Sequence, residues 1–514
     1  MARDSRDPHG TASADQPDQV PSPVGEGTGA PASRPGGAGP DNRVTRMGTE
    51  SIPRLITEFA IPSVVGMVVN GSYNIIDSMF LGHAVGEIGL SAVTVANPTM
   101  IVFMALAMLV GAGGNALAAL RLGEGDRDAA ERSLGNVVTL SLILWVVVAA
   151  LAANPTILDA VLTLSSATDE VRPYARTFVQ ILCFGFILQC IGMGVNNFIR
   201  TAGAPNRALG TMVIGLVAAT AFNYWFVILL GWGVAGSALA TLAGQACSCA
   251  AVLWYFLFTK GVPLRIRLSC MVPSRRIVGT ILAFGFPSFA LQAGAAVVNF
   301  LLNYQLVKYG ALSPLGAEDA LASIGVVQRI GMFTIMPIIG VSVAIQPLLG
   351  YNYGARKLDR VRATLWLGIA GATVMCVVEW VVVMLLAEPI ATAFGIAHDG
   401  LVDFTSFALR LWLLLLPFIG FQIVGANYFQ ATGQPAKAIF LTLTRQIIFL
   451  VPLILVLPDL LPRAVSSLTG LEALIVAAPV SDFLAIFTVG VFLAWEMRRL
   501  RRMQGARGRG PGAA

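Results

Sequence analysis

The chain has 514 residues, of which 56% are apolar and only 12% are charged, and its mean hydropathy is +0.75. A soluble domain carries about 25% charged residues, so this composition excludes an ordinary soluble enzyme and indicates a chain that uses lipid as its solvent. The net charge is +6, which we attribute to short basic loops on one membrane face rather than to a nucleic-acid partner.

The first fifty residues are rich in Gly, Pro, Asp and Ser and contain few large apolar residues. Such a segment cannot bury enough surface to fold, and it lacks the apolar core of a signal peptide. We therefore predict a disordered cytoplasmic tail over residues 1–50.

From residue 52 onward, apolar runs alternate with short polar connections. A spanning helix needs about 20 apolar residues, which predicts an all-α polytopic membrane protein with about twelve spans. We expect spans near 59–82, 90–118, 136–153, 174–198, 209–230, 234–258, 280–307, 320–349, 364–387, 404–430, 439–457 and 471–496. The corresponding regions are a six-helix lobe over 51–258, a cytoplasmic linker over 259–279, a second six-helix lobe over 280–497 and a basic cytoplasmic tail over 498–514.

Lysine and arginine are distributed unevenly between the two sides of these spans. The side of the N-terminal tail carries 27 of them and the opposite side carries 4, while Arg329, Arg410 and Arg445 fall inside spans. Cytoplasmic loops carry the excess of basic residues in membrane proteins. We therefore predict a bacterial cytoplasmic-membrane protein, surrounded by membrane lipids, with both termini in the cytoplasm.

Three short segments of the first half recur in the second half. They are Phe59–Ser63 with Phe284–Ser288, Leu117–Gly123 with Leu348–Gly354, and Arg200–Pro205 with Gln430–Pro435. Six spans per half make both halves start from the same side, so the repeats are parallel and related by an axis along the membrane normal. Two such pseudo-symmetric lobes around a central cavity favour a transporter over a single-pore channel or a receptor.

Polar side chains follow one face of the first span. Asn70, Asn74 and Asp77 are spaced i, i+4 and i+7, which places them on the same side of a helix. Asp77 lies about 27 Å along the helix from Phe59, in the outer third of the span. An ionised carboxylate there is costly unless it faces a wet cavity or a partner. A proton or Na⁺ would neutralise it; the alternative is an interfacial aspartate that reaches water.

The second half carries further charges inside its spans. Glu379 lies in the ninth span, and Arg410, Arg445 and Asp482 lie in the tenth, eleventh and twelfth. Buried charges in membrane helices pair with one another or mark a functional site. We favour a structural pair for Arg445 and Asp482, whereas Glu379 either carries a proton or binds a cationic substrate.

Several ordered motifs are similar to those of one transporter family. They are Asn74–Gly82, Gly114–Ala118, Arg200–Pro205, Gly233–Thr241, Gln346–Ala355, Thr444–Gln446 and Ala478–Asp482. Over residues 50–500 the chain therefore resembles the multidrug and toxic compound extrusion (MATE) transporters. This resemblance implies two six-helix lobes, alternating access and export of drugs or other small organic compounds, often cationic, in exchange for H⁺ or Na⁺.

The resemblance also implies a coupling site in the first lobe. Asp77 matches the family's first-span aspartate, Thr241 its sixth-span threonine and Asn196 a fourth-span asparagine, while the fifth-span aspartate of one branch is Asn223 here. A single carboxylate favours H⁺ slightly over Na⁺, and no other metal or cofactor is expected. The acidic positions that another branch uses are Ala295 and Ile419 here.

Other polar residues of the spans are candidates for the substrate cavity. They are Asn70, Tyr73, Gln292 and Gln346. We expect the protein to act as a monomer, and its natural substrate is left open.

Two other functions compete with this reading. A flippase for lipid-linked oligosaccharide or peptidoglycan precursor, from the same superfamily, needs cationic charge in its cavity, and Arg329, Arg410 and Arg445 would supply it. An enzyme is not expected, because the sequence contains no HExxH motif or nucleophile elbow, and ATP-driven transport is not expected because it contains no GxxxxGK[ST] loop.

Overall fold

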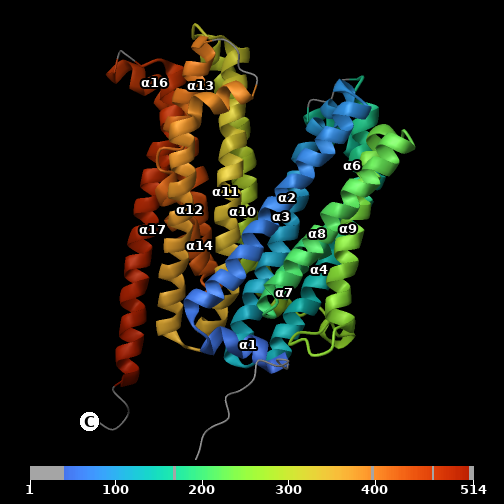
Figure 1. The fold of residues 1–514 in the computed structure, drawn as a ribbon, viewed down its shortest axis with the longest axis vertical. Coiled ribbons are helices and arrows are strands. Elements are labelled where there is room, and N and C mark those ends of the chain that lie inside the picture. Colours follow the sequence, from blue (N-terminus) through green and yellow to red (C-terminus); the bar gives the residue numbers. More distant parts are fainter. Residues whose placement is uncertain (1–39, 166–168, 395–398, 466–467, 509–514) are drawn as a thin grey trace, which may run out of the picture. The chain divides into compact units, whose positions relative to one another are not determined.

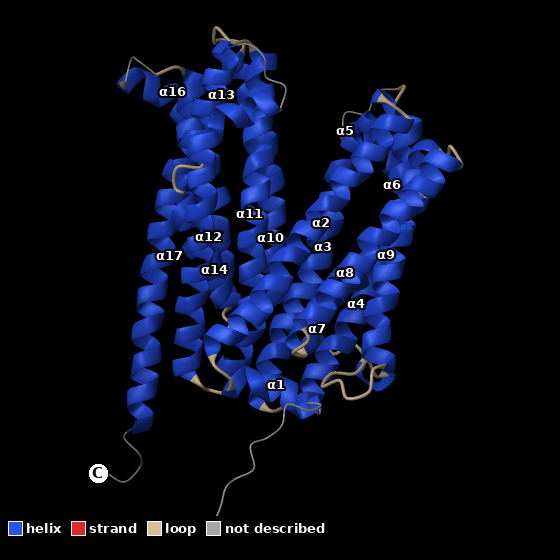
Figure 2. Cartoon of the chain, in the orientation of Figure 1, coloured by secondary structure: helices blue, strands red, loops and turns tan. Residues whose placement is uncertain are grey.

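The structure is a computed structural model that describes residues 40–165, 169–394, 399–465 and 468–508. These residues form helices joined by turns and short loops (Figure 2). Among them, 11 helices are long and apolar enough to cross a membrane, or 12 if the bent pair Gly400–Trp412 and Leu416–Ala431 forms one span. The predicted all-α architecture with about twelve spans is therefore confirmed.

The first bundle contains helices α2 to α9. Their bounds are α2 Ile52–Ala84, α3 Glu87–Glu124, α4 Arg127–Ala153, α5 Pro155–Leu164, α6 Arg172–Gln189, α7 Asn196–Thr201, α8 Pro205–Asn223 and α9 Gly233–Phe258, with the π-helical turns η1 Cys190–Val195 and η2 Tyr224–Leu229. Phe59, Phe178 and Phe198 are among the largest fully buried side chains of the protein.

The second bundle contains helices α10 to α17. Their bounds are α10 Arg275–Gly310, α11 Ala317–Gly354, α12 Leu358–Ala393, α13 Asp399–Trp412, α14 Leu416–Ala431, α15 Pro435–Leu443, α16 Val451–Ala464 and α17 Gly470–Gly508, with the π-helical turn η4 Thr444–Leu450 between α15 and α16. One contiguous apolar cluster, which includes Tyr428 and Phe429, forms its core. Figure 1 shows the two bundles side by side, in blue to green and in yellow to red.

The start of several helices follows from local sequence signals. Proline occupies one of the first two positions of α2, α5, α6, α8, α14 and α15, where the missing N–H is not needed and the fixed φ suits a helix. The Asp126 carboxylate accepts a hydrogen bond from the Ala129 N–H at 2.9 Å and caps α4. Gly125 ends α3 in the left-handed conformation, with φ of 83°.

The two bundles meet near one end of their helices. This end, here called the basic end, carries the turn between α3 and α4, the turn between α11 and α12, and the 259–274 linker (Figure 1). A Cβ on Gly123 would lie 2.0 Å from the Tyr351 carbonyl oxygen, and one on Gly354 would lie 2.1 Å from the Leu120 carbonyl oxygen. Only glycine permits this approach of α3 to α11.

A buried hydrogen bond joins the bundles at the same end. The Asn115 amide donates to Gln346 Oε1 at 3.3 Å, and the Thr201 hydroxyl donates to Asn115 Oδ1 at 2.6 Å. Asn115 and Gln346 lie 231 positions apart, which is the spacing of the repeated Leu117 and Leu348 segments. Contacts between equivalent residues are what an axis relating two parallel repeats requires.

Part of the predicted tail organisation is wrong. The predicted disordered tail over 1–50 ends in a helix, α1 Pro40–Thr49, because Val44 and Met47 bury one of its faces; residues 1–39 lie outside the described part. Helix α17 extends to Gly508, into the segment predicted as a basic cytoplasmic tail over 498–514, and that assignment stays a prediction. Helix α10 also begins at Arg275, inside the predicted 259–279 linker.

The linker between the bundles is hydrogen-bonded to α4. The Asn136 side chain donates to the Cys270 carbonyl at 3.3 Å and accepts from the Ser274 N–H at 3.2 Å. The Thr139 hydroxyl donates to the Met271 carbonyl at 2.7 Å. Glu131, only 1% exposed, faces Arg267 at 3.2 Å. The linker therefore packs as part of the first bundle.

Candidate functional site

A partly buried carboxylate lies where three helices of the first bundle meet. Asp77 projects from α2, and its Oδ1 accepts a hydrogen bond from the Ser237 hydroxyl of α9. The Asn223 side chain, at the end of α8, interacts with the same carboxyl group. Asp77 and Asn223 thus lie together, as the family resemblance implied.

The partners of this carboxylate are neutral. Ser237 and Asn223 are 0% and 2% exposed, and no lysine or arginine of the described residues forms an ion pair with Asp77. The Asn223 Oδ1 is buried and has no hydrogen-bond partner in this part of the chain. A carboxylate beside an unpaired amide oxygen suits a proton or a hard monovalent cation, which would remove a charge that is costly in the membrane.

The backbone beside the site departs from α-helical geometry. Asn223 directly precedes the π-helical turn η2, Asn196 directly follows η1, and Arg445 lies within η4. Such turns are rare and occur frequently at functional sites. Two of them flank residues predicted for the coupling site and the third holds a predicted buried charge.

Ser237 is the residue of this site that sequence reasoning missed. Thr241 was expected to contribute, but it makes no hydrogen bond to Asp77 among the described contacts. Ser237 lies four residues before Thr241, one turn away on the same face of α9, and that spacing could have indicated it. The Asn74 side chain lies outside the described residues.

Asn196 was predicted at the coupling site, and this prediction is wrong. Its amide donates to the Ala208 carbonyl at 3.2 Å and to the Thr211 hydroxyl at 3.1 Å. Thr211 precedes Asn223 by twelve residues on α8, which is about 18 Å along the helix. Asn196 instead joins α7 to the start of α8, nearer the basic end.

Comparison with known proteins identifies the family. The sequence model of MatE matches residues 62–225 and 276–456, which is more than half of the chain. The chain belongs to the MATE transporter family. The predicted family, and a transporter rather than an enzyme, are therefore confirmed.

Individual relatives agree with this assignment. The multidrug export protein MepA of Staphylococcus haemolyticus (strain JCSC1435) is 26% identical over 446 residues, covering 85% of this chain and 93% of MepA. The solved structure of the MATE multidrug transporter DinF-BH in complex with R6G is 32% identical, with a TM-score of 0.78 over 88% of this chain and 97% of that chain. An outward-facing multidrug resistance MATE transporter of the MOP superfamily shares the fold, with 24% identity and a TM-score of 0.77 over 90% of this chain and 97% of that chain.

The transporter's predicted cavity residues do not gather in one place. Gln346 is 5% exposed and bonded to Asn115 between the bundles, so its assignment to an open cavity is wrong. Tyr73 lies on α2 one helical turn before Asp77, and its hydroxyl packs against Gly215 of α8. Asn70 and Gln292 are partly exposed.

The second bundle of the transporter contains an ion pair with one buried and one partly buried partner. Arg445 Nε lies 2.6 Å from Asp482 Oδ1, and the Asp482 side chain is 4% exposed. The neighbouring Ser481 hydroxyl donates to the Arg445 carbonyl at 2.7 Å. The predicted pairing of these two residues is therefore present and joins η4 to α17.

The remaining predicted charges differ in their exposure and in whether they have a partner. Arg410 pairs with Glu388 at 3.2 Å on an exposed surface, while Arg329 is exposed. Glu379 Oε2 is buried and has no hydrogen-bond partner among the described residues. Carboxylates neutralise Arg410 and Arg445, so Arg329 is the only one of these three arginines without an ion pair among the described residues.

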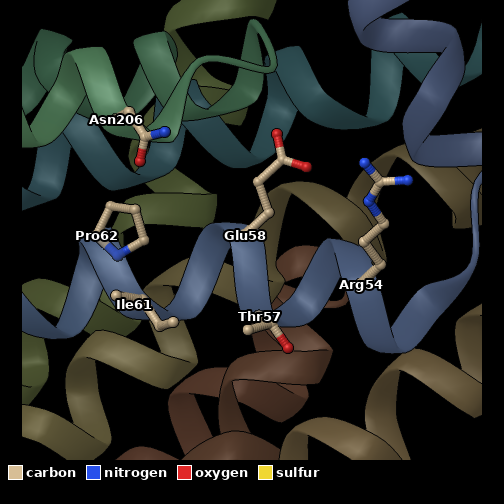
Figure 3. A pocket seen from close by; sticks show the side chains of 6 residues that line it. All are labelled: Arg54, Thr57, Glu58, Ile61, Pro62 and Asn206. Carbon is tan, nitrogen blue, oxygen red and sulfur yellow. The ribbon is translucent and has the colours of Figure 1, made fainter.

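A cavity of about 580 Å³ lies away from all of these residues. It is lined by Arg54, Thr57, Glu58, Ile61 and Pro62 of α2 and by Asn206 of α8, which faces them from across the space (Figure 3). Pro62 precedes Asp77 by fifteen residues, about 22 Å along α2. This cavity is therefore not part of the Asp77 site.

Proposed function

We propose that this MATE transporter exports small organic compounds, including cationic drugs, in exchange for H⁺ or Na⁺. The observation that carries the proposal is the Asp77 carboxylate, whose partners among the described residues of the first bundle are neutral. The names of its relatives, multidrug export protein and multidrug transporter, support the substrate class.

Neutralisation of Asp77 would couple the ion to the helices around it. Without a bound cation, Ser237 and Asn223 hydrogen-bond to the ionised carboxyl group, and the Asn223 Oδ1 has no partner among the described residues. A bound proton or Na⁺ would replace these hydrogen bonds or add a ligand to them, and so change the packing of α2, α8 and α9. Coupling of this kind requires that the ion bind one conformation of the carrier more tightly than the other.

The composition of the site favours the proton slightly over Na⁺. Na⁺ sites with two carboxylates hold the cation by charge, whereas Asp77 is accompanied here by the neutral Asn223 and Ser237. A single carboxylate needs only one proton to become neutral.

The basic end is proposed to be cytoplasmic, from the 27-to-4 distribution of lysine and arginine. Since the bundles meet at that end and separate toward the opposite end in Figure 1, the conformation described would be outward-facing. A thiol reagent that cannot cross the membrane should label a cysteine at His83 from outside cells and leave one at Arg360 unlabelled. The reverse pattern would contradict this orientation.

The coupling proposal is tested with purified protein in liposomes under an imposed pH or Na⁺ gradient. Asp77→Asn should abolish gradient-driven dye transport while the protein stays folded, because the amide cannot bind and release a proton. Asp77→Glu should retain part of the activity. Transport by Asp77→Asn at the wild-type rate, with the same ion dependence, would show that Asp77 is only an interfacial residue, and Glu379 would then be the first candidate.

A further inference from the structure

The short helix α1 lies at the basic end, before the first span (Figure 1). Val44 and Met47 are 8% and 1% exposed and belong to an apolar cluster that joins residues of both bundles at this end. A Cβ on Gly203, in the turn before α8, would lie 3.0 Å from the Arg43 carbonyl oxygen. One face of α1 is therefore packed on the first bundle.

Ion pairs fix α1 to the start of α2. Arg46 Nε lies 2.6 Å from Glu50, and Arg46 Nη2 lies 2.8 Å from Glu58. The Arg46 guanidinium also holds the pKa of the Glu50 carboxyl below its usual range, mainly through their hydrogen bond. Since Glu58 belongs to α2, α1 will move with the first bundle.

The other contacts of α1 go to the second bundle. Lys357 donates to the Gly48 carbonyl at 2.8 Å, and Arg360 donates to the Glu50 carbonyl at 2.6 Å. The Met47 carbonyl accepts from Asn352 at 3.0 Å and from Arg360 at 3.2 Å. The last carbonyls of a helix have no partner within it and carry partial negative charge, so two cations and an amide of the second bundle satisfy them.

We propose that α1 with these bonds is a clasp that holds the two lobes together at the cytoplasmic end, and that Lys357 and Arg360 are its positioning residues. The proposal rests on the transport function proposed above. Alternating access requires the lobes to part at this end, and α1 cannot remain on both lobes when they do. Because these bonds require α1 to contact both lobes, they favour the conformation in which the lobes are closed at this end over the one in which they are open there.

The experiment measures inter-lobe distances by spin labels in lipid nanodiscs, after replacement of the six native cysteines. Arg132→Cys with Arg502→Cys reports the cytoplasmic end, and Tyr174→Cys with Leu312→Cys reports the opposite end; all four positions are exposed. Lys357→Ala with Arg360→Ala should raise the ratio of inward- to outward-facing molecules at least about tenfold, equivalent to about 1.4 kcal/mol. The cytoplasmic distance should lengthen while the outer distance shortens.

The matched control is Arg362→Ala, which removes a positive charge from the same helix without touching α1. It should leave both distance distributions at their wild-type values. A double variant with unchanged distributions, or a control that shifts them equally, would overturn the clasp.

A second measurement locks the clasp instead of weakening it. A short reducible cross-linker between Thr49→Cys and Lys357→Cys, two exposed positions, should stop transport, and reduction should restore it. Wild-type transport with the cross-link complete would overturn the proposal. Failure of the clasp leaves the Asp77 result untouched, and a neutral Asp77→Asn variant leaves the distance shifts untouched, so the two proposals fail separately.

Discussion

Two aspartates inside the helical bundles have opposite surroundings. Asp77 in the first bundle is held by a hydroxyl and an amide, whereas Asp482 in the second bundle lies 2.6 Å from the Arg445 guanidinium. The cation next to Asp482 already neutralises it, so it has no need of a mobile ion. Asp77 has no such partner among the described residues, and an ion from solution can take that place.

The comparison shows that a buried charge in a membrane helix is not by itself a transport residue. Its role depends on whether its counter-charge is built into the protein or arrives from solution. Both aspartates lie in motifs that resemble the MATE family, and sequence position alone does not separate the two roles.

The largest expected effect concerns the built-in pair. Asp482→Asn should destabilise the protein by up to about 3 kcal/mol, because it leaves the partly buried Arg445 without its counter-charge. Thermal unfolding in lipid would measure the loss, and Arg445→Gln combined with Asp482→Asn should recover much of it. If the single and double variants are equally damaged, the pair does not hold η4 against α17.

The next prediction concerns a variant that gives the Asp77 site a second carboxylate. Asn223→Asp places a second carboxylate beside Asp77, and two neighbouring carboxylates do not both ionise without a bound cation. Transport by this variant should become dependent on Na⁺, or proton-driven transport should move to a higher pH range. Unchanged Na⁺ and pH dependence would indicate that position 223 is remote from the bound ion.

The smallest expected effect separates two hydroxyls on one helix. Ser237→Ala removes the donor to Asp77, and a hydrogen bond to a charged group is worth about 1.5–3 kcal/mol. The pH dependence of transport should shift, and Thr241→Ala, one turn away, is the matched control with no expected shift. A shift with Thr241→Ala and none with Ser237→Ala would reverse the assignment.

Glu379 in the second bundle is a second acid without a described partner, so the two bundles do not differ in every buried acid. Its Oε2 has no hydrogen-bond partner in the described chain, which places it with Asp77 rather than with Asp482. The sequence left Glu379 open between proton carrier and substrate ligand, and no lysine or arginine of the described residues forms an ion pair with it.

Much of the architecture could be predicted from the sequence, because apolar runs of spanning length and the bias of basic residues act locally. The predicted spans fall within observed helices, apart from residue 230 at the end of the fifth and apart from the tenth, which corresponds to one bent pair. Where composition was used alone, it failed: residues 40–49 are polar enough to suggest disorder, yet they fold because Met47 is buried and Lys357 and Arg360 satisfy their last carbonyls.

The sequence therefore identified Asp77 as the candidate acid, whereas tertiary packing decided which side chains contact it. Asp77 and Ser237 lie 160 positions apart, and a rotation or shift of α9 by one turn would have offered Thr241 instead. Similarly, Asn196 shares its side-chain chemistry with Asn223, but packing sends it to Thr211. Spacing along one helix is set by its geometry, whereas the meeting of three helices depends on every side chain between them.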